Sequence, residues 1–161
     1  MDKTIDLESK LISNFQAKRK IIIVGIGNIL RGDDAIGPAI IENLNGKVGA
    51  VCIDAGSAPE NYIGKIIKED PDAVLIIDAV DLGLEAGSYD LLVNSDILSS
   101  GFTTHDLSPD MFINFLKKET NADIYLLGIQ PQRVSFGDEM SQRVKKRIIE
   151  ISELIKEVFN A

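Results

Sequence analysis

A glycine-rich segment near the start of the chain carries two adjacent carboxylates. It reads GIGNILRGDDAIGPAI from residue 25 to residue 40 and contains Gly27, Asn28, Asp33 and Asp34. A glycine-rich turn between a strand and a helix often holds a phosphate at the positive helix end, but here the anions are built into the chain. The segment therefore favours carboxylate chemistry, either metal binding or proton transfer with water.

Two further segments carry residues of the same kind. LIIDAVDLG closes an apolar run with Asp78 and continues to Asp81, and TTHDLSP contains His105, the only histidine. Because open α/β sheets place their sites at the carboxyl ends of strands, Asp34, Asp78 and His105 can converge in space. Two carboxylates and an imidazole suit a borderline divalent ion such as nickel, zinc or cobalt, with coordination positions left open.

Each of these residues also has a simpler interpretation. Either aspartate of the first pair can be a helix N-cap, and if Asp33 is the cap, Asp34 is left to face the crevice. Asp78 can bind loop amides, although a carboxylate at the end of an apolar run must be hydrogen-bonded or paired. A lone loop histidine such as His105 often has no task. Residue types alone leave these alternatives open.

Several common mechanisms are not supported. Leu30 stands where the dinucleotide fingerprint G-x-G-x-x-G needs its third glycine, and no Gly-Lys-Ser or Gly-Lys-Thr sequence follows. The chain has no G-x-S-x-G elbow, and Cys52 lies inside an apolar strand, where a thiol is usually inert packing. Carboxylate-activated or metal-activated water remains as the favoured chemistry.

The composition of the chain limits which partners it can bind and which cellular compartment it is expected to occupy. The net charge of −8 opposes binding to nucleic acid, whose phosphates must be neutralised by Lys and Arg. One cysteine cannot form an internal disulfide, and no signal peptide is recognisable, so we expect a cytoplasmic protein. No apolar segment approaches the roughly 20 residues that span a bilayer, so membrane insertion is not expected. No heptad seam demands a dimer, and a monomer is the expected state.

The alternation of strand and helix patterns predicts an α/β fold. We expect a three-layer α/β/α sandwich around a mainly parallel, twisted sheet of about five strands. The link between the third and fourth strands is too short for a parallel crossover, so the fourth is expected to be an antiparallel edge strand. The expected strands begin at Ile21 and Ala50 and span Asp72–Ala79, Ser88–Val93 and Ala122–Gln130.

The chain is expected to form a single domain, 1–161. Within it, residues 1–19 form an amphipathic appendage that places Leu7, Leu11, Ile12 and Phe15 on one helical face, and residues 20–161 form the core. Further helices are expected from Asp33 or Asp34 to Gly46, after Ser57 as a cap, after Ser108, and along the apolar stripe of the last segment.

These motifs together resemble the hydrogenase maturation endopeptidases that trim the large subunit of [NiFe] hydrogenases. The resemblance is carried by GIGNILRGDDAIGP, LIIDAVDLG and TTHDLSP in that order, and it extends from Ile21 to the final helix. IDAGSAPENYIGKI and YLLGIQP make the chain most similar to the branch that serves the formate-hydrogenlyase hydrogenase. By this resemblance, Asp34, Asp78 and His105 match the three metal-contacting positions.

The resemblance also implies a mechanism. Nickel is supplied by the precursor rather than permanently bound, other divalent ions can occupy the site, and a C-terminal peptide is removed after nickel insertion. Asp34 and Asp78 are the candidate catalytic residues, with the role of base unassigned. Gly27, Asn28, Asp33 and Asp81 are expected to support the site or bind substrate.

Two other functions use the same residues. A nickel or cobalt chaperone would bind the ion tightly and cleave nothing, whereas a small-molecule metallohydrolase would turn over small esters or phosphates. The peptidase is the expected function, and its partner is the [NiFe] hydrogenase large-subunit precursor.

Overall fold

The computed structural model describes residues 3–93 and 109–160. The strands are β1 (Ile21–Ile26), β2 (Val51–Gly56), β3 (Ala73–Ala79), β4 (Tyr89–Val93) and β5 (Asp123–Ile129). The α-helices in this part of the chain are α1 (Lys3–Phe15), α2 (Ile36–Leu44), α3 (Ile63–Glu69), α5 (Pro109–Glu119) and α6 (Gln142–Val158). Two short 3₁₀ helices, η1 (Gly32–Ala35) and η2 (Pro59–Tyr62), precede α2 and α3.

The sheet has five strands in the order β2-β1-β3-β5-β4. β1, β2, β3 and β5 run parallel, whereas β4 is antiparallel to β5, with Tyr89 opposite Ile129 and Val93 opposite Tyr125. The predicted α/β class and the antiparallel edge are both confirmed. The short link after β3 leaves no room for a crossover helix, so the chain turns back beside β5.

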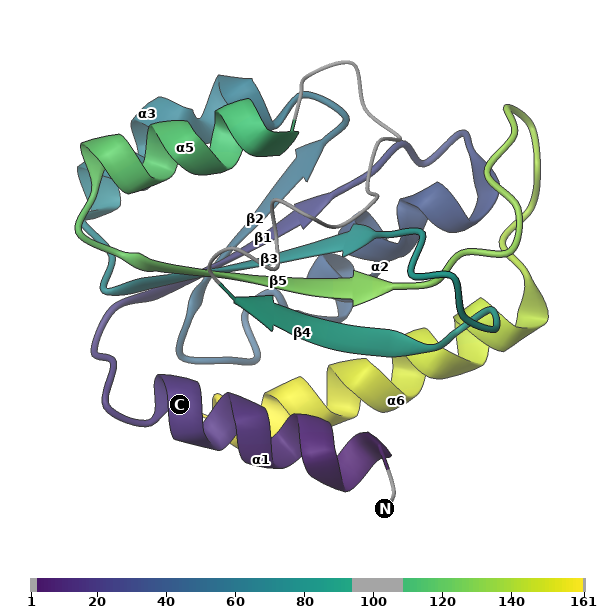
Figure 1. The fold of residues 1–161 in the computed structure, drawn as a ribbon, viewed down its shortest axis with the longest axis horizontal. Coiled ribbons are helices and arrows are strands. Elements are labelled where there is room, and N and C mark those ends of the chain that lie inside the picture. Colours follow the sequence, from purple (N-terminus) through teal and green to yellow (C-terminus); the bar gives the residue numbers. More distant parts are fainter. Residues whose placement is uncertain (1–2, 94–108, 161) are drawn as a thin grey trace.

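Helices cover both faces of this sheet (Figure 1). α1, α2 and α6 lie on one face, and α3 and α5 lie on the other. A hydrophobic core lies on each face of the sheet, and the fully buried strand β3 contributes to both. Leu75 and Ile77 pack in the core under α1, α2 and α6, whereas Val74 and Ile76 pack in the core under α3 and α5. Apart from Asp78, this strand is apolar on both faces rather than alternating, as is usual for a parallel strand buried on both sides.

Helix α1 is packed into the first of these cores. Leu7, Leu11 and Phe15 are buried, and the Phe15 ring centroid lies 4.6 Å from that of Tyr125 and 5.3 Å from that of Phe159. Ile12, expected on the same face, is instead 42% exposed, because it follows Leu11 and is rotated about 100° around the helix axis. The burial of these three side chains is what holds α1 on the sheet.

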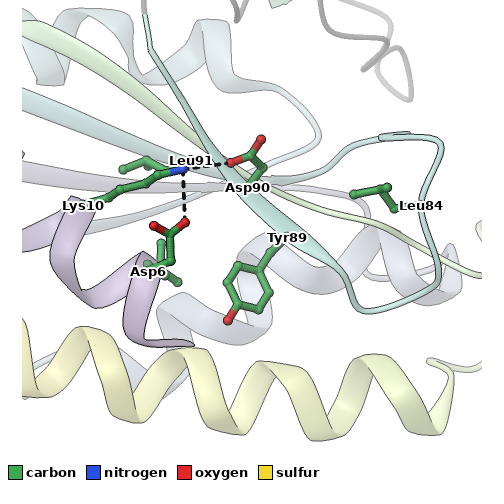
Figure 2. Close-up of a pocket in the computed structure, with 7 residues that line it drawn as sticks. Asp6, Lys10, Leu84, Tyr89, Asp90 and Leu91 are labelled. Atoms are coloured by element: carbon green, nitrogen blue, oxygen red, sulfur yellow. Dashed lines mark hydrogen bonds and ion pairs between the residues drawn. The ribbon is translucent and has the colours of Figure 1, made fainter. Parts of the chain in front are cut away.

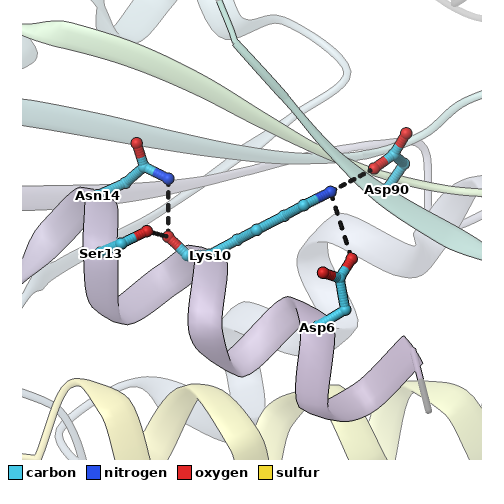
Figure 3. A network of polar contacts seen from close by, with 5 residues as sticks. All are labelled: Asp6, Lys10, Ser13, Asn14 and Asp90. Atoms are coloured by element: carbon cyan, nitrogen blue, oxygen red, sulfur yellow. Dashed lines mark hydrogen bonds and ion pairs between the residues drawn. The ribbon is translucent and has the colours of Figure 1, made fainter. Parts of the chain in front are cut away.

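A polar contact also links α1 to the edge strand β4. Lys10 Nζ lies 3.4 Å from Asp6 Oδ2 and 3.5 Å from Asp90 Oδ1 (Figure 3). Partial burial opposes protonation of Lys10, but the two carboxylates outweigh it and raise the pKa of the ammonium group. Figure 2 shows the surface pocket that these residues line with Leu84, Tyr89 and Leu91. A half-exposed ion pair is worth at most about 1 kcal/mol, so it orients α1 more than it stabilises it.

Helix α2 lies unusually close to β1 and β3 because glycine occupies the point of contact. A Cβ atom added to Gly37 would lie 2.3 Å from the carbonyl oxygen of Ile26 and 2.7 Å from that of Ile77. On the strand side, a Cβ at Gly25 would lie 2.4 Å from the carbonyl oxygen of Gly37. Any larger side chain at either position would push the helix away from the strands.

The predicted helix starts were wrong in detail. α2 and α3 are both preceded by a 3₁₀ turn. The N-cap residues are Arg31 for η1, Ala35 for α2 and Ala58 for η2, and none of them makes a side-chain cap hydrogen bond. Asp33 and Ser57 therefore do not stand at these cap positions. The carboxylate of Asp33 has other partners.

Among the helices in the described ranges, none is long and apolar enough to cross a membrane.

The glycine contact makes a testable prediction about stability. Replacing Gly37 by Ala should lower the free energy of unfolding by about 2 to 3 kcal/mol, because the new methyl group overlaps the backbone of β1 and β3. Gly64→Ala in α3 is the matched control: its methyl group meets nothing within 4 Å, and it should raise stability by about 0.5 to 1 kcal/mol. Urea unfolding measures both. Equal stability of Gly37→Ala and wild type would contradict the close contact.

Candidate active site

The candidate site lies at the carboxyl ends of β1 and β3, which are neighbours in the sheet. Gly27 and Asn28 follow β1 directly, Asp33 and Asp34 lie in η1, and Asp78 is the penultimate residue of β3. In Figure 1 the connection from β1 to α2 leaves the sheet at the same end as the tip of β3. The contact between η1 and β3 brings these two segments together.

Asp34 is fully buried, and only one of its carboxylate oxygens is used. Oδ2 accepts a hydrogen bond from the backbone N–H of Asn28 at 2.9 Å, whereas Oδ1 is buried without a hydrogen-bond partner in residues 3–93 and 109–160. A buried polar atom without a partner typically costs about 1 to 3 kcal/mol, so folded proteins contain few of them. Such an atom has unused capacity to bind a metal ion or to accept a proton.

Gly27 and Asn28 hold Asp34 through their backbone. A Cβ atom at Gly27 would lie 1.8 Å from the carbonyl oxygen of Asp34, so a side chain is excluded there. The side-chain Oδ1 of Asn28 accepts the N–H of Leu30 at 2.9 Å, and its backbone N–H donates to Asp34 Oδ2 at 2.9 Å. Both residues thus contact Asp34 through their backbone, and their role in the site stays a prediction.

Asp33 has a different environment from its neighbour. Its Oδ1 accepts the N–H of Ser141 at 2.7 Å, and its Oδ2 accepts the Ser141 hydroxyl at 2.8 Å. The N–H groups of Gln132 and Arg133 also bind Oδ2, at 2.8 and 3.2 Å. Asp33 therefore fastens the β5–α6 connection to η1 instead of capping α2.

Asp78 is fully buried near the end of β3 and faces away from α2. It stands at the position after Ile77 and shares its face with Val74 and Ile76, which pack under α3 and α5. Its Oδ1 accepts the N–H of Ala79 at 2.8 Å. Asp81, in contrast, is exposed, and its Oδ1 accepts the N–H of Gly83 at 3.1 Å in a local turn. None of the hydrogen bonds or ion pairs among the described residues joins Asp81 to Asp34.

His105 lies outside the described residues, in the segment 94–108. Its convergence with Asp34 and Asp78 therefore stays a prediction. Within the described part of the chain, no group of three or more His, Cys, Asp and Glu residues is arranged to hold a metal ion. The two buried aspartates are the part of the predicted triad that the structure places.

Two buried polar residues at this end of the sheet, Gln130 and Ser141, were missed from the sequence. Gln130 follows β5 and accepts the N–H groups of Leu82 and Leu84 through its side-chain oxygen, which orders the loop after β3. Ser141, just before α6, is the main partner of Asp33. Their positions at the end of a strand and the start of a helix were recognisable in the sequence, but their distant partners were not.

The lone thiol is poorly suited to covalent catalysis. Burial raises the pKa of Cys52, which lies half-buried on the edge strand β2. A thiol with a raised pKa forms little thiolate at neutral pH, and the thiolate is the nucleophile. This agrees with the expectation that Cys52 is inert packing.

A family model and individual relatives of known proteins all point to the same protein family. Residues 38–158 match the family model described as hydrogenase maturation protease. A putative hydrogenase maturation protease of Methanocaldococcus jannaschii is 30% identical over 166 residues, covering 94% of this chain and 98% of the relative. The hydrogenase 3 maturation protease of Escherichia coli K12 is 36% identical over 130 residues, covering 79% of this chain and 83% of its own length.

A solved structure agrees with the sequence relatives. The crystal structure of a [NiFe] hydrogenase maturation protease from Thermococcus kodakarensis superposes with a TM-score of 0.84 at 34% identity. The match covers 96% of this chain and 98% of that chain. The fold described above is thus the fold of that protease.

The contacts of Asp33 predict a structural role for it. Asp33→Asn should lower the free energy of unfolding by about 2 to 3 kcal/mol, because an amide NH₂ would face N–H and O–H donors that now bind a charged oxygen. Asp54→Asn is the matched control, since Asp54 is exposed and its Oδ1 accepts the N–H of Gly56, two positions along the chain, at 3.0 Å. Urea unfolding should leave that control within about 0.5 kcal/mol of wild type. Equal effects of the two substitutions would refute the role of Asp33.

Proposed function

Because the chain belongs to the hydrogenase maturation protease family, we propose that it removes a C-terminal extension from the large-subunit precursor of a [NiFe] hydrogenase. The chain is a peptidase by family. The identity of its protein substrate is the proposed part, and it agrees with the motifs around Asp34, Asp78 and His105.

One observation carries the proposal: the buried Oδ1 of Asp34 has no hydrogen-bond partner in the described chain. A carboxylate that only supported the fold would be expected to use both oxygens, as Asp33 does next to it. The cost of leaving Oδ1 unsatisfied is offset if the atom acts on a substrate. An anionic oxygen suits a metal ligand or a proton acceptor equally.

We further propose that the metal is nickel carried by the precursor. Asp34, Asp78 and His105 would add oxygen and nitrogen ligands to an ion that the precursor already holds, with other divalent ions able to occupy the same place. Three ligands leave coordination positions for the substrate. Recognition of this kind would restrict cleavage to precursors that have received their nickel.

The hydrolytic step needs a water and a proton acceptor. The water oxygen bonds to the scissile carbonyl carbon, the carbon–nitrogen bond breaks, and the leaving amine takes up a proton. Asp34 and Asp78 are both proposed as acceptors for the proton of the attacking water, and polarisation of the carbonyl by nickel is the alternative route. The proposal thus describes a carboxylate-dependent endopeptidase without assigning the base.

The proposal includes a working unit and a compartment. We propose a monomer in the cytoplasm, supported by the single cysteine, which cannot form an internal disulfide, and by the absence of a sequence pattern that demands a dimer.

The proposal predicts nickel-dependent processing. Purified protein is incubated with a cognate large-subunit precursor, with and without prior nickel loading, and the intact mass of the precursor is measured. Loss of a C-terminal peptide should occur only in the loaded sample. Cleavage without nickel would remove nickel recognition from the proposal, and no cleavage of a demonstrably loaded precursor would favour the chaperone.

His105→Ala is the companion variant for this assay. It should abolish processing of the nickel-loaded precursor, because one of the three proposed ligands is lost, while leaving the thermal midpoint within a few degrees of wild type. A variant that unfolds, or one that processes at the wild-type rate, would contradict the proposed role of His105.

A further inference from the structure

Two loops beside the candidate site expose large apolar side chains. Ile29 and Leu30 in the β1–η1 loop are 71% and 56% exposed, and Phe136 in the β5–α6 connection is 73% exposed. We call these three residues the loop patch. A single exposed apolar residue is ordinary, whereas a group of them often marks a surface that another protein covers.

The two loops form one unit. The N–H of Gly137 donates to the carbonyl oxygen of Leu30 at 2.8 Å, and the N–H of Asp33 donates to the carbonyl oxygen of Arg133 at 2.8 Å. The carboxylate of Asp33 adds its bonds to Gln132, Arg133 and Ser141. In Figure 1 both loops lie together at one end of the sheet. The loop patch is therefore held in place before any partner arrives, which lowers the entropic cost of docking.

The loop patch borders the candidate site directly. Ile29 and Leu30 are the next two residues after Asn28, whose N–H binds the carboxylate of Asp34. The N–H of Asp34 also donates to the carbonyl oxygen of Arg31, the residue after Leu30, at 3.0 Å. The loop patch is thus continuous with the place where the proposed substrate is cut.

The charges around the loop patch suit an interface. Arg31 and Arg133 are exposed on the same two loops. Two carboxylates lie on the β5–α6 connection as well. Glu139 is exposed, and Asp138 Oδ2 accepts the N–H of Ser135 at 2.9 Å. Aromatic residues and arginine are enriched at protein interfaces. On a chain of net charge −8, this end of the molecule offers a partner apolar contact and two guanidinium groups.

We propose that Ile29, Leu30 and Phe136 form the docking surface for the folded body of the precursor, while its C-terminal tail reaches Asp34. This inference rests on the proposed function and adds the surface that selects the substrate. Docking of the folded body holds the tail at a high effective concentration beside the carboxylates. An isolated tail peptide has no such advantage, so the enzyme would discriminate by the folded protein rather than by the tail sequence.

The test uses the double variant Ile29→Ser with Phe136→Ser in the whole protein, and Ile149→Ser as the matched control. Ile149 is 62% exposed on α6, away from both loops. Binding to the immobilised nickel-loaded precursor and initial cleavage rates are measured for each protein. The double variant should bind at least about tenfold more weakly and show a correspondingly higher KM, with kcat within about twofold of wild type. Ile149→Ser should match wild type in both assays.

The outcomes separate the docking surface from the proposed function. If wild type cleaves the precursor and the double variant keeps the wild-type KM, the docking proposal is overturned and the peptidase function stands. If wild type binds without cleaving and the double variant binds at least about tenfold more weakly, docking is supported and the proposed cleavage is overturned. If wild type neither binds nor cleaves, both fail.

Two controls keep the result interpretable. The thermal midpoints of the variants should stay within a few degrees of wild type, since the changed side chains are already exposed. Sedimentation velocity tests the competing occupant: a wild-type dimer that the double variant dissociates would show that the loop patch binds a second copy of this chain, which would overturn docking of the precursor.

Discussion

The close approach of α2 to β1 and β3 is the constraint on which the candidate site depends. Gly37 faces the backbone of Ile26 and Ile77 at distances that admit no side chain. Because α2 packs so closely on the sheet, the 3₁₀ turn η1 before it lies against the strand ends. The carbonyl oxygen of Asp34 there packs directly on Gly27, where a Cβ atom would lie 1.8 Å from it. The carboxylate of Asp34 is fully buried at this point.

Two adjacent aspartates divide the work at this end of the sheet. Asp33 uses both carboxylate oxygens to bind backbone and hydroxyl donors of the β5–α6 connection. Asp34 uses one oxygen, and the other is buried without a partner in the described residues. The first arrangement stabilises the fold, whereas the second costs stability and leaves an atom available for chemistry, as is common where stability and activity conflict.

Local sequence patterns predicted the layers, the parallel strands and the antiparallel β4, because burial and loop length determine these features directly. They also predicted that Asp78 lies at the end of β3 and that Asp34 lies between β1 and α2, as the structure has them. They failed where a distant segment decides the outcome: Asp33 looked like a helix cap, but its partner Ser141 is 108 positions away. Gln130 was missed for the same reason, since nothing beside it indicates that it binds the loop after β3.

The division between the two aspartates is tested most directly by Asp34→Asn, with single-turnover cleavage of a nickel-loaded precursor and urea unfolding measured on the same preparation. The asparagine oxygen can still accept the N–H of Asn28, and a buried charge is removed, so the free energy of unfolding should be unchanged or higher. Cleavage should fall by at least about a hundredfold, because the anionic oxygen is lost. A variant that is strongly destabilised yet cleaves at the wild-type rate while folded would show that Asp34 serves the fold rather than the chemistry.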